Sequence, residues 1–172
     1  MEIRRKGLDV LIQAIRSLVE THHQHAVLAV LIGTGEDQQA LERMVREADL
    51  EDHVLFAGEQ HDPYSIIEKC QVFVLPSRRE GMPNVLLEAM ALGVCCISTD
   101  CPTGPREIIR HGENGLLVPV EDSDRISESI LRMIQDPEAR ERMGREGLET
   151  VRQNFSISTM AGSYHHLLSE LV

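Results

Sequence analysis

The feature that most constrains the fold is a series of short, continuous apolar runs separated by segments with helical periodicity. The runs are rich in Val, Leu, Ile and Phe and occupy residues 26–32, 54–58, 72–75 and 94–98. A strand that is apolar at successive positions is buried on both faces, which is typical of parallel sheets covered by helices. The alternation predicts an α/β fold: a Rossmann-like doubly wound parallel sheet flanked by helices.

Helical patterns fill the intervals between these runs. Apolar residues recur every three or four positions in residues 8–19, 41–48 and 83–92, and residues 62–70 predict a short helix. A last strand is expected at 115–118, followed by helices at 123–135, 137–153 and 156–171. We expect a single domain over residues 1–172, because 172 residues suit one hydrophobic core.

Composition narrows the range of partners. Aromatic residues make up 3% of the chain and Trp is absent, which argues against a base-stacking platform for nucleic acid. The formal net charge of −11 argues against binding along a phosphate backbone. We therefore expect no nucleic-acid partner, although a local anion pocket built from backbone amides and a few cations stays open.

The cysteines indicate a reducing compartment. Cys70, Cys95, Cys96 and Cys101 show no paired CxxC spacing, so neither a zinc site nor a disulfide framework is expected. We find no signal-peptide pattern and no apolar run of membrane length, and we expect a cytoplasmic location.

The stretch at residues 77–89, Ser-Arg-Arg-Glu-Gly-Met-Pro-Asn-Val-Leu-Leu-Glu-Ala, contains the strongest functional signal. Pro83 suits the first turn of a helix, whose free N–H groups attract anions such as phosphate. Glu80 and Glu88 suit the hydroxyls of a sugar or ribose, because ionised carboxylates accept hydrogen bonds. A sugar nucleotide offers both features. From residue types alone, two solvated glutamates explain the pattern equally well.

The chain closely resembles the C-terminal nucleotide-binding domain of the retaining GT-B glycosyltransferases of family 4. The resemblance covers nearly the whole chain. It rests on Lys-Gly at 6–7, Leu-Ile-Gly-Thr-Gly at 31–35, Phe-Ala-Gly at 56–58, Phe-Val-Leu-Pro-Ser at 73–77, the run from Glu80 to Gly93, Ser-Thr-Asp at 98–100, Glu-Ile-Ile at 107–109 and Asn-Gly-Leu-Leu-Val at 114–118. The Glu-x7-Glu element is the most specific part.

The resemblance implies roles for the acidic residues and the loop between them. Glu80 contacts hydroxyls of the donor sugar and helps to stabilise positive charge at the anomeric carbon, and Glu88 accepts hydrogen bonds from the ribose. Backbone amides of the loop hold sugar and phosphate oxygens. The donor-binding set then includes Gly81, Met82, Pro83, Asn84 and Val85.

Lys6 matches a family lysine that binds the donor diphosphate, where it offsets the charge of the leaving group. Lys6 and Glu80 are the two candidate catalytic residues. The family also has an Arg earlier, on the strand that opens the domain. Arg4 and Arg5 are out of register with it, so neither inherits the role.

The resemblance adds two further loops to the donor-binding set. Gly33 and Gly35 follow a strand and, on their own, indicate a tight strand-to-helix turn; the resemblance places them at an interdomain cleft. The loop that begins at Gly58 is expected to line the base pocket. Residues 101–107 contain Pro-Thr-Gly-Pro where many members have paired glycines, a form that resembles members building surface polysaccharides or lipid-linked glycans.

The expected activity is retaining transfer of a hexose-type sugar from a nucleotide-diphosphate sugar, with a UDP-sugar favoured, to a glycan or lipid-linked acceptor. No metal and no cofactor are expected. The N-terminal acceptor domain and the opening strand of the sheet are absent from residues 1–172, so we interpret the chain as a fragment or truncated gene product that is inactive alone. Self-association through an unpaired sheet edge is a further expectation. A membrane-associated acceptor would bring the complete enzyme to the inner face of the membrane.

Two alternatives stay open at this point. A sugar-nucleotide epimerase of the same fold would need acid–base residues from a partner domain. A non-catalytic nucleotide-sensing module would use the same binding loops without chemistry.

Overall fold

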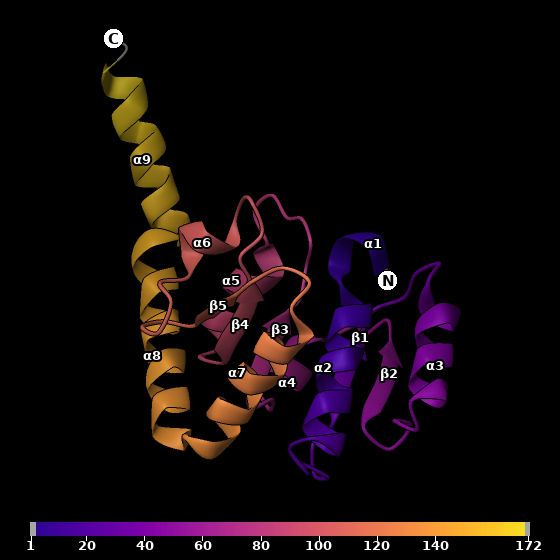
Figure 1. Ribbon diagram of the computed structural model, residues 1–172. Coiled ribbons are helices and arrows are strands. Elements are labelled where there is room, and N and C mark those ends of the chain that lie inside the picture. Colours follow the sequence, from indigo (N-terminus) through magenta and orange to yellow (C-terminus); the bar gives the residue numbers. More distant parts are fainter. Residues whose placement is uncertain (1–2, 171–172) are drawn as a thin grey trace.

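The computed structural model describes residues 3–170, and its strands pair only in parallel. Strand β1 (Ala29–Ile32) pairs with β2 (Val54–Gly58), and β3 (Val72–Leu75) pairs with β4 (Cys95–Thr99), which also pairs with β5 (Leu116–Val118). Helices connect these strands (Figure 1). The predicted α/β class is confirmed.

The hydrogen-bonded ladder is interrupted between β1 and β3. The strand orders are β1-β2 in one sheet and β3-β4-β5 in the other. The hydrophobic core nevertheless crosses the interruption, because Leu31 of β1 and Ile97 of β4 belong to the same buried cluster. The strands therefore form two separate hydrogen-bonded sheets, but their side chains pack in one continuous core.

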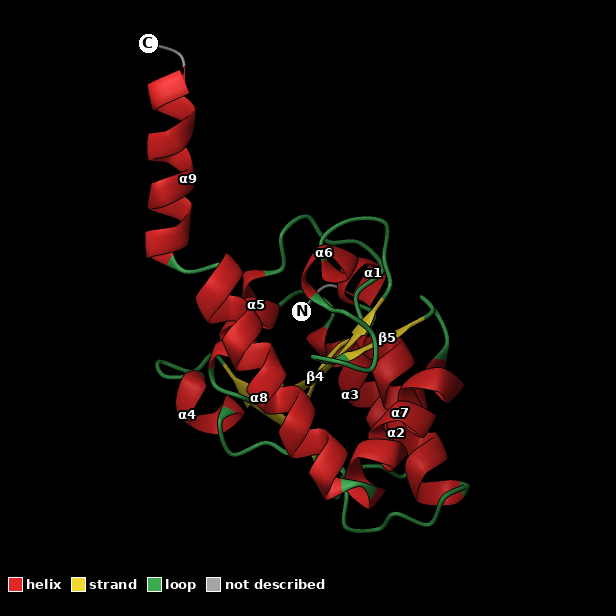
Figure 2. Ribbon diagram, turned by 90° about the vertical axis from the view of Figure 1, so that its left-hand side faces the viewer, coloured by secondary structure: helices red, strands yellow, loops and turns green. Residues whose placement is uncertain are grey.

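Helices cover the strands on both faces. Helices α2, α3 and α7 pack in the cluster that contains Leu31, and α4 and α5 pack in a second cluster with Leu75 and Cys96 (Figures 1 and 2). The helices are α1 (Ile3–Lys6), α2 (Leu8–Glu20), α3 (Gln38–Glu47), α4 (Tyr64–Ile67), α5 (Asn84–Ala91), α6 (Pro105–Ile108), α7 (Ser123–Gln135), α8 (Pro137–Asn154) and α9 (Ile157–Glu170).

Strand β4 lies between these two layers. All five of its residues are buried. Cys95 and Ile97 contribute to the cluster on one face, and Cys96 contributes to the cluster on the other. This alternation follows from the two-residue period of a strand and explains the continuous apolar run in the sequence.

The short elements differ most from the predictions. Strand β1 begins at Ala29 rather than residue 26, because a turn precedes it, and α4 covers only the middle of the predicted 62–70 helix. Helices α1 and α6 were not predicted, because four residues are too few to show periodicity. Leu171, the predicted end of the last helix, lies outside the described residues.

Helix α9 projects away from the body (Figures 1 and 2). Its exposed large apolar side chains are Ile157, Met160, Leu167 and Leu168. Within residues 3–170, no helix is both long and apolar enough to cross a membrane.

Candidate active site around Glu80

The start of α5 presents free backbone N–H groups directly after the β3 loop. Pro83 is the N-cap with φ −79°, so the helix begins one residue later than predicted, at Asn84. The Leu86 amide donates to Pro83 O at 2.9 Å. The amides of Asn84 and Val85 have no acceptor among the described residues. Free N–H groups at the start of a helix carry partial positive charge, which attracts anions.

Glu80 lies in that loop and is held by two side chains. Its Oε1 accepts a hydrogen bond from Ser77 Oγ at 2.7 Å and forms an ion pair with Lys6 Nζ at 2.7 Å. The Glu80 side chain is only 9% exposed. Its second oxygen, Oε2, has no partner among the described residues, and the Lys6 ammonium has further N–H groups to donate. The two candidate catalytic residues are thus in direct contact.

A close backbone approach brings Lys6 to this position. Gly7, the N-cap of α2, has φ 62°, and a Cβ there would lie 2.1 Å from Pro76 O. Only glycine accommodates both the left-handed conformation and the contact. The close contact between the backbones at residues 7 and 76 therefore brings Lys6 near Glu80.

The loop after β4 packs on the Glu80 loop from the other side. Thr103 Oγ1 donates to Glu80 O. A Cβ at Gly104, where φ is 88°, would lie 2.1 Å from Gly81 O. The Pro-Thr-Gly-Pro segment thus supports the backbone at Glu80 and Gly81.

A buried thiol lies next to this loop, where Cys101 Sγ donates to Thr103 O at 3.6 Å. Cys101 is fully buried, and burial raises its pKa above the ordinary thiol value, with a further contribution from the nearby Glu80 charge. A thiol with a raised pKa remains protonated at neutral pH and is a poor nucleophile.

Glu88 lies one helical turn after Asn84 on α5. Residues four apart share a helix face, so Glu88 lies on the same face of α5 as Asn84. Its side chain is partly exposed, and its carboxylate accepts no hydrogen bond from the described residues. It is free to bind a hydroxyl.

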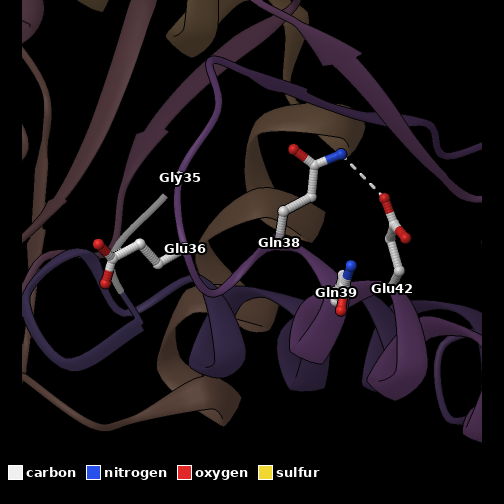
Figure 3. Close-up of a pocket in the computed structure, with 5 residues that line it drawn as sticks. All are labelled: Gly35, Glu36, Gln38, Gln39 and Glu42. Carbon is white, nitrogen blue, oxygen red and sulfur yellow. Dashed lines mark hydrogen bonds between the residues drawn. The ribbon is translucent and has the colours of Figure 1, made fainter.

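The predicted glycines lie at the ends of β1 and β2. Gly33, with φ 110°, donates its amide to Gly58 O at 2.6 Å, and Gly58 has φ 67°. Gly35 lines a shallow pocket of about 360 Å³ together with Glu36, Gln38, Gln39 and Glu42. Figure 3 shows Glu36 on the opposite side of the loop from Gln38, whose amide donates to Glu42 Oε1 at 2.9 Å. These carboxylates and amides suit hydroxyls better than phosphate.

Among the residues whose side chains are described, no group of three or more His, Cys, Asp and Glu residues could hold a metal ion. The cation in contact with Glu80 is the Lys6 ammonium.

A sequence model of the family described as "Glycosyl transferases group 1" matches residues 3–150. The chain belongs to this family. The lipopolysaccharide core biosynthesis glycosyltransferase LpsE of Rhizobium meliloti (strain 1021) is 32% identical over 167 residues, which cover 97% of this chain and 47% of LpsE.

Solved structures share the fold. A point mutant of S. aureus TarM, in complex with Fondaparinux, alpha-GlcNAc-glycerol and UDP, matches with a TM-score of 0.89 at 22% identity over 95% of this chain and 33% of that one. Anabaena Alr3699/HepE in complex with UDP matches with a TM-score of 0.87 at 24% identity over 96% and 45%. The chain spans less than half the length of these relatives.

Two supports of Glu80 in this group 1 glycosyltransferase domain were missed by sequence reasoning. Ser77 lies three positions before Glu80, a spacing that local turn geometry could have indicated. Thr103 lies 23 positions away on another loop, and no sequence signal identifies it.

Proposed function

We propose that this chain is the donor-binding domain of a retaining family 4 glycosyltransferase of the GT-B fold. It binds a nucleotide-diphosphate sugar, preferably a UDP-sugar, from which a hexose-type unit passes to a glycan or lipid-linked acceptor. The main supporting observation is the direct contact between the Lys6 ammonium and the Glu80 carboxylate. Glu80 lies in the loop that leads into the free amides at the start of α5. TarM and HepE were crystallised with UDP, which supports the nucleotide choice.

The leaving group is stabilised by positive charge and dipoles. When the bond between the anomeric carbon and the phosphate oxygen breaks, negative charge develops on the diphosphate. Lys6 donates to it through the N–H groups that Glu80 does not use, and the amides of Asn84 and Val85 donate from the helix end. Preorganised donors of this kind typically contribute about 3–4 kcal/mol each to catalysis.

The sugar is bound and stabilised by the acidic residues. Glu80 Oε2 accepts a hydrogen bond from a sugar hydroxyl, while Ser77 and Lys6 hold Oε1 in place. The same carboxylate favours the positive charge that develops on the sugar ring. Glu88 accepts from the ribose, Gly81 and Met82 complete the sugar loop, and the loops at Gly33, Gly35 and Gly58 border the nucleotide.

The complete enzyme contains more than this domain. LpsE is about twice as long as the matched region, which supports a second domain that binds the acceptor. The interrupted ladder supports one additional strand between β1 and β3. We propose that the chain alone binds a nucleoside diphosphate weakly and transfers nothing, and that the complete enzyme acts in the cytoplasm, on acceptors at the inner face of the membrane.

Calorimetric titration of the chain with UDP, GDP and ADP tests this function. We expect UDP to bind with the highest affinity. Glu80→Ala should retain UDP affinity, because its partner Lys6 remains, yet abolish transfer in the complete enzyme. Glu51→Ala, at an exposed glutamate, is the matched control and should change neither. If the wild-type chain binds none of the three nucleotides, or if Glu80→Ala retains full transfer, the proposal is wrong.

A further inference from the structure

Arg78, two residues before Glu80, joins three segments that are distant in sequence. Its Nη1 and Nη2 donate to the two carboxylate oxygens of Asp9, each at 2.8 Å. Its Nη2 also donates to Glu121 Oε2 at 2.8 Å, and its Nε donates to Glu121 Oε1. Asp9 lies in the first turn of α2, and Glu121 lies in the loop before α7. One guanidinium therefore holds two carboxylates through paired hydrogen bonds.

The backbone of the same residue adds another contact. Arg78 N donates to Arg5 O at 2.8 Å. Together with the close approach of Gly7 to Pro76, these contacts fasten residues 5–9 to residues 76–80. The ion pair between Lys6 and Glu80 lies inside this pair of segments. Any loosening there changes the position of Lys6 relative to Glu80.

The two carboxylates respond to Arg78 electrostatically. Burial alone would raise the pKa of Asp9, but the hydrogen bonds and charge of Arg78 outweigh it and hold that pKa below the ordinary value. The hydrogen bonds of Arg78 also lower the pKa of Glu121. Asp9 gains further from its place at a helix N-terminus.

Glu121 also adopts an uncommon backbone conformation. Its φ is 64°, in the left-handed region that non-glycine residues rarely occupy. Such a residue persists when surrounding contacts determine its conformation. The paired hydrogen bonds from Arg78 are contacts of that kind.

Arg79 provides an internal comparison. It has the same side chain, is adjacent to Arg78 in sequence, and lies one residue nearer to Glu80 along the chain. It is exposed and makes no ion pair with any residue that the structure describes. Both arginines therefore place a positive charge near the loop, but the hydrogen bonds to Asp9 of α2 and to Glu121 before α7 are made by Arg78.

We propose that Arg78 is a positioning residue that fixes the β3–α5 loop against the start of α2 and thereby holds Lys6 and Glu80 in the arrangement that binds the donor. Its effect on donor binding rests on the proposed function. Arg78 touches neither sugar nor diphosphate; it acts through the Lys6–Glu80 pair. Lysine cannot replace it, because an ammonium lacks the planar fork that pairs with a carboxylate through two bonds.

The first experiment needs no ligand. Amide hydrogen exchange is measured for the wild-type chain and for Arg78→Met, Arg78→Lys and Arg79→Met. We expect the amides of residues 77–80 to exchange at least about tenfold faster in both Arg78 variants, and at the wild-type rate in Arg79→Met. Asp9→Asn, a milder change, should give a smaller increase at the same amides and serves if Arg78→Met does not fold. Wild-type exchange in the Arg78 and Asp9 variants would overturn the proposal.

The second experiment separates positioning from general stability. Lys6→Met is made in the wild-type, Arg78→Met and Arg79→Met backgrounds, and the affinity for UDP is measured well below each melting temperature. We expect Lys6→Met to weaken binding about tenfold or more in the wild-type and Arg79→Met backgrounds, but no more than about twofold in Arg78→Met. An equal effect of Lys6→Met in all three backgrounds means that Arg78 stabilises the fold without positioning Lys6, and the proposal is wrong. If the wild-type chain binds no nucleotide, the proposed function fails, while hydrogen exchange still decides whether Arg78 fixes the loop.

Discussion

Strands β4 and β1 show how differently two parts of one α/β body can be supported. In β4 all five residues are buried and strands lie on both sides, whereas β1 has one buried residue and, within residues 3–170, pairs with β2 alone. We call β3, β4, β5 and the helices α5 and α8 the three-stranded half, and β1, β2 and α3 the two-stranded half.

The candidate site follows this division. Glu80 and the start of α5 belong to the three-stranded half, while Gly33 and Gly58 belong to the two-stranded half. The Glu80 carboxylate follows β3, which like β1 has one buried residue and one paired neighbour among the described strands, so its placement depends on contacts of its own loop with Lys6, Ser77 and Thr103. Functional groups perform well when packed elements hold them, which is what this arrangement provides.

The largest expected difference between the halves is in the response to truncated side chains. Leu86 of α5 is fully buried, whereas Leu55 of β2 is 50% exposed. We expect Leu86→Ala to lower the free energy of unfolding by about 2–5 kcal/mol and Leu55→Ala by no more than about 0.5 kcal/mol. Urea denaturation followed by circular dichroism measures both. Equal losses would show that Leu55 is covered in solution, for example by another copy of the chain.

The next effect concerns the contact that brings Lys6 to the three-stranded half. Gly7→Ala places a methyl group against Pro76 O in a left-handed conformation, which we expect to cost about 1–3 kcal/mol. It should also weaken UDP binding, because Lys6 moves away from the start of α5, where we propose that the diphosphate binds. Gly162→Ala is the control: its position on α9 is open, and alanine there should be neutral or slightly stabilising. Unchanged stability and UDP affinity in Gly7→Ala would contradict the close approach.

A smaller effect should appear in the pH dependence of stability. The pKa of Asp9 is lowered by Arg78 in the folded chain, against an ordinary value of about 4 in the unfolded one. The contribution of this pair is therefore present above the unfolded pKa and is lost as the pH falls through the folded pKa. Thermal melts between pH 6 and pH 3 should show a steeper decrease for the wild type than for Asp9→Asn. Parallel curves would mean that the ion pair contributes nothing in solution.

The smallest effect concerns individual amides on β1. Ala29 N donates to His53 O and Gly33 N donates to Gly58 O, so by parity the Leu31 amide faces β2 while those of Val30 and Ile32 face the free edge. We expect Leu31 to exchange its amide hydrogen slowly and Val30 and Ile32 rapidly. In β4 we expect slow exchange along the strand. Equal protection of Val30 and Leu31 would show that a strand, from another copy or another segment, occupies the edge.

Much of the fold could be predicted from local sequence patterns. The boundaries of β2 and β3 were predicted correctly, because continuous apolar runs end at glycine or proline. Helix α7 was predicted with its full extent, because Asp122 caps its start and Pro137 follows its end. In these cases the signal lies within the element or in the residues next to its ends.

The contacts of the site could not be predicted in the same way. The resemblance named Lys6 and Glu80 separately, but their ion pair joins residues 74 positions apart and depends on how Gly7 meets Pro76. The different roles of Arg78 and Arg79 depend on the direction in which the loop points each side chain. The interruption between β1 and β3 is not visible in either strand, because each has an ordinary apolar sequence; only the resemblance, with its missing opening strand, led us to expect an unpaired sheet edge.

Adjacent cysteines on β4 give this chain two natural reporters of opening. Cys95 and Cys96 are both buried, and they face opposite layers of the fold. A thiol reagent reaches either one only after the helices on its own side have moved. Labelling kinetics resolved by mass spectrometry would therefore reveal whether the two layers separate from the sheet together or one before the other.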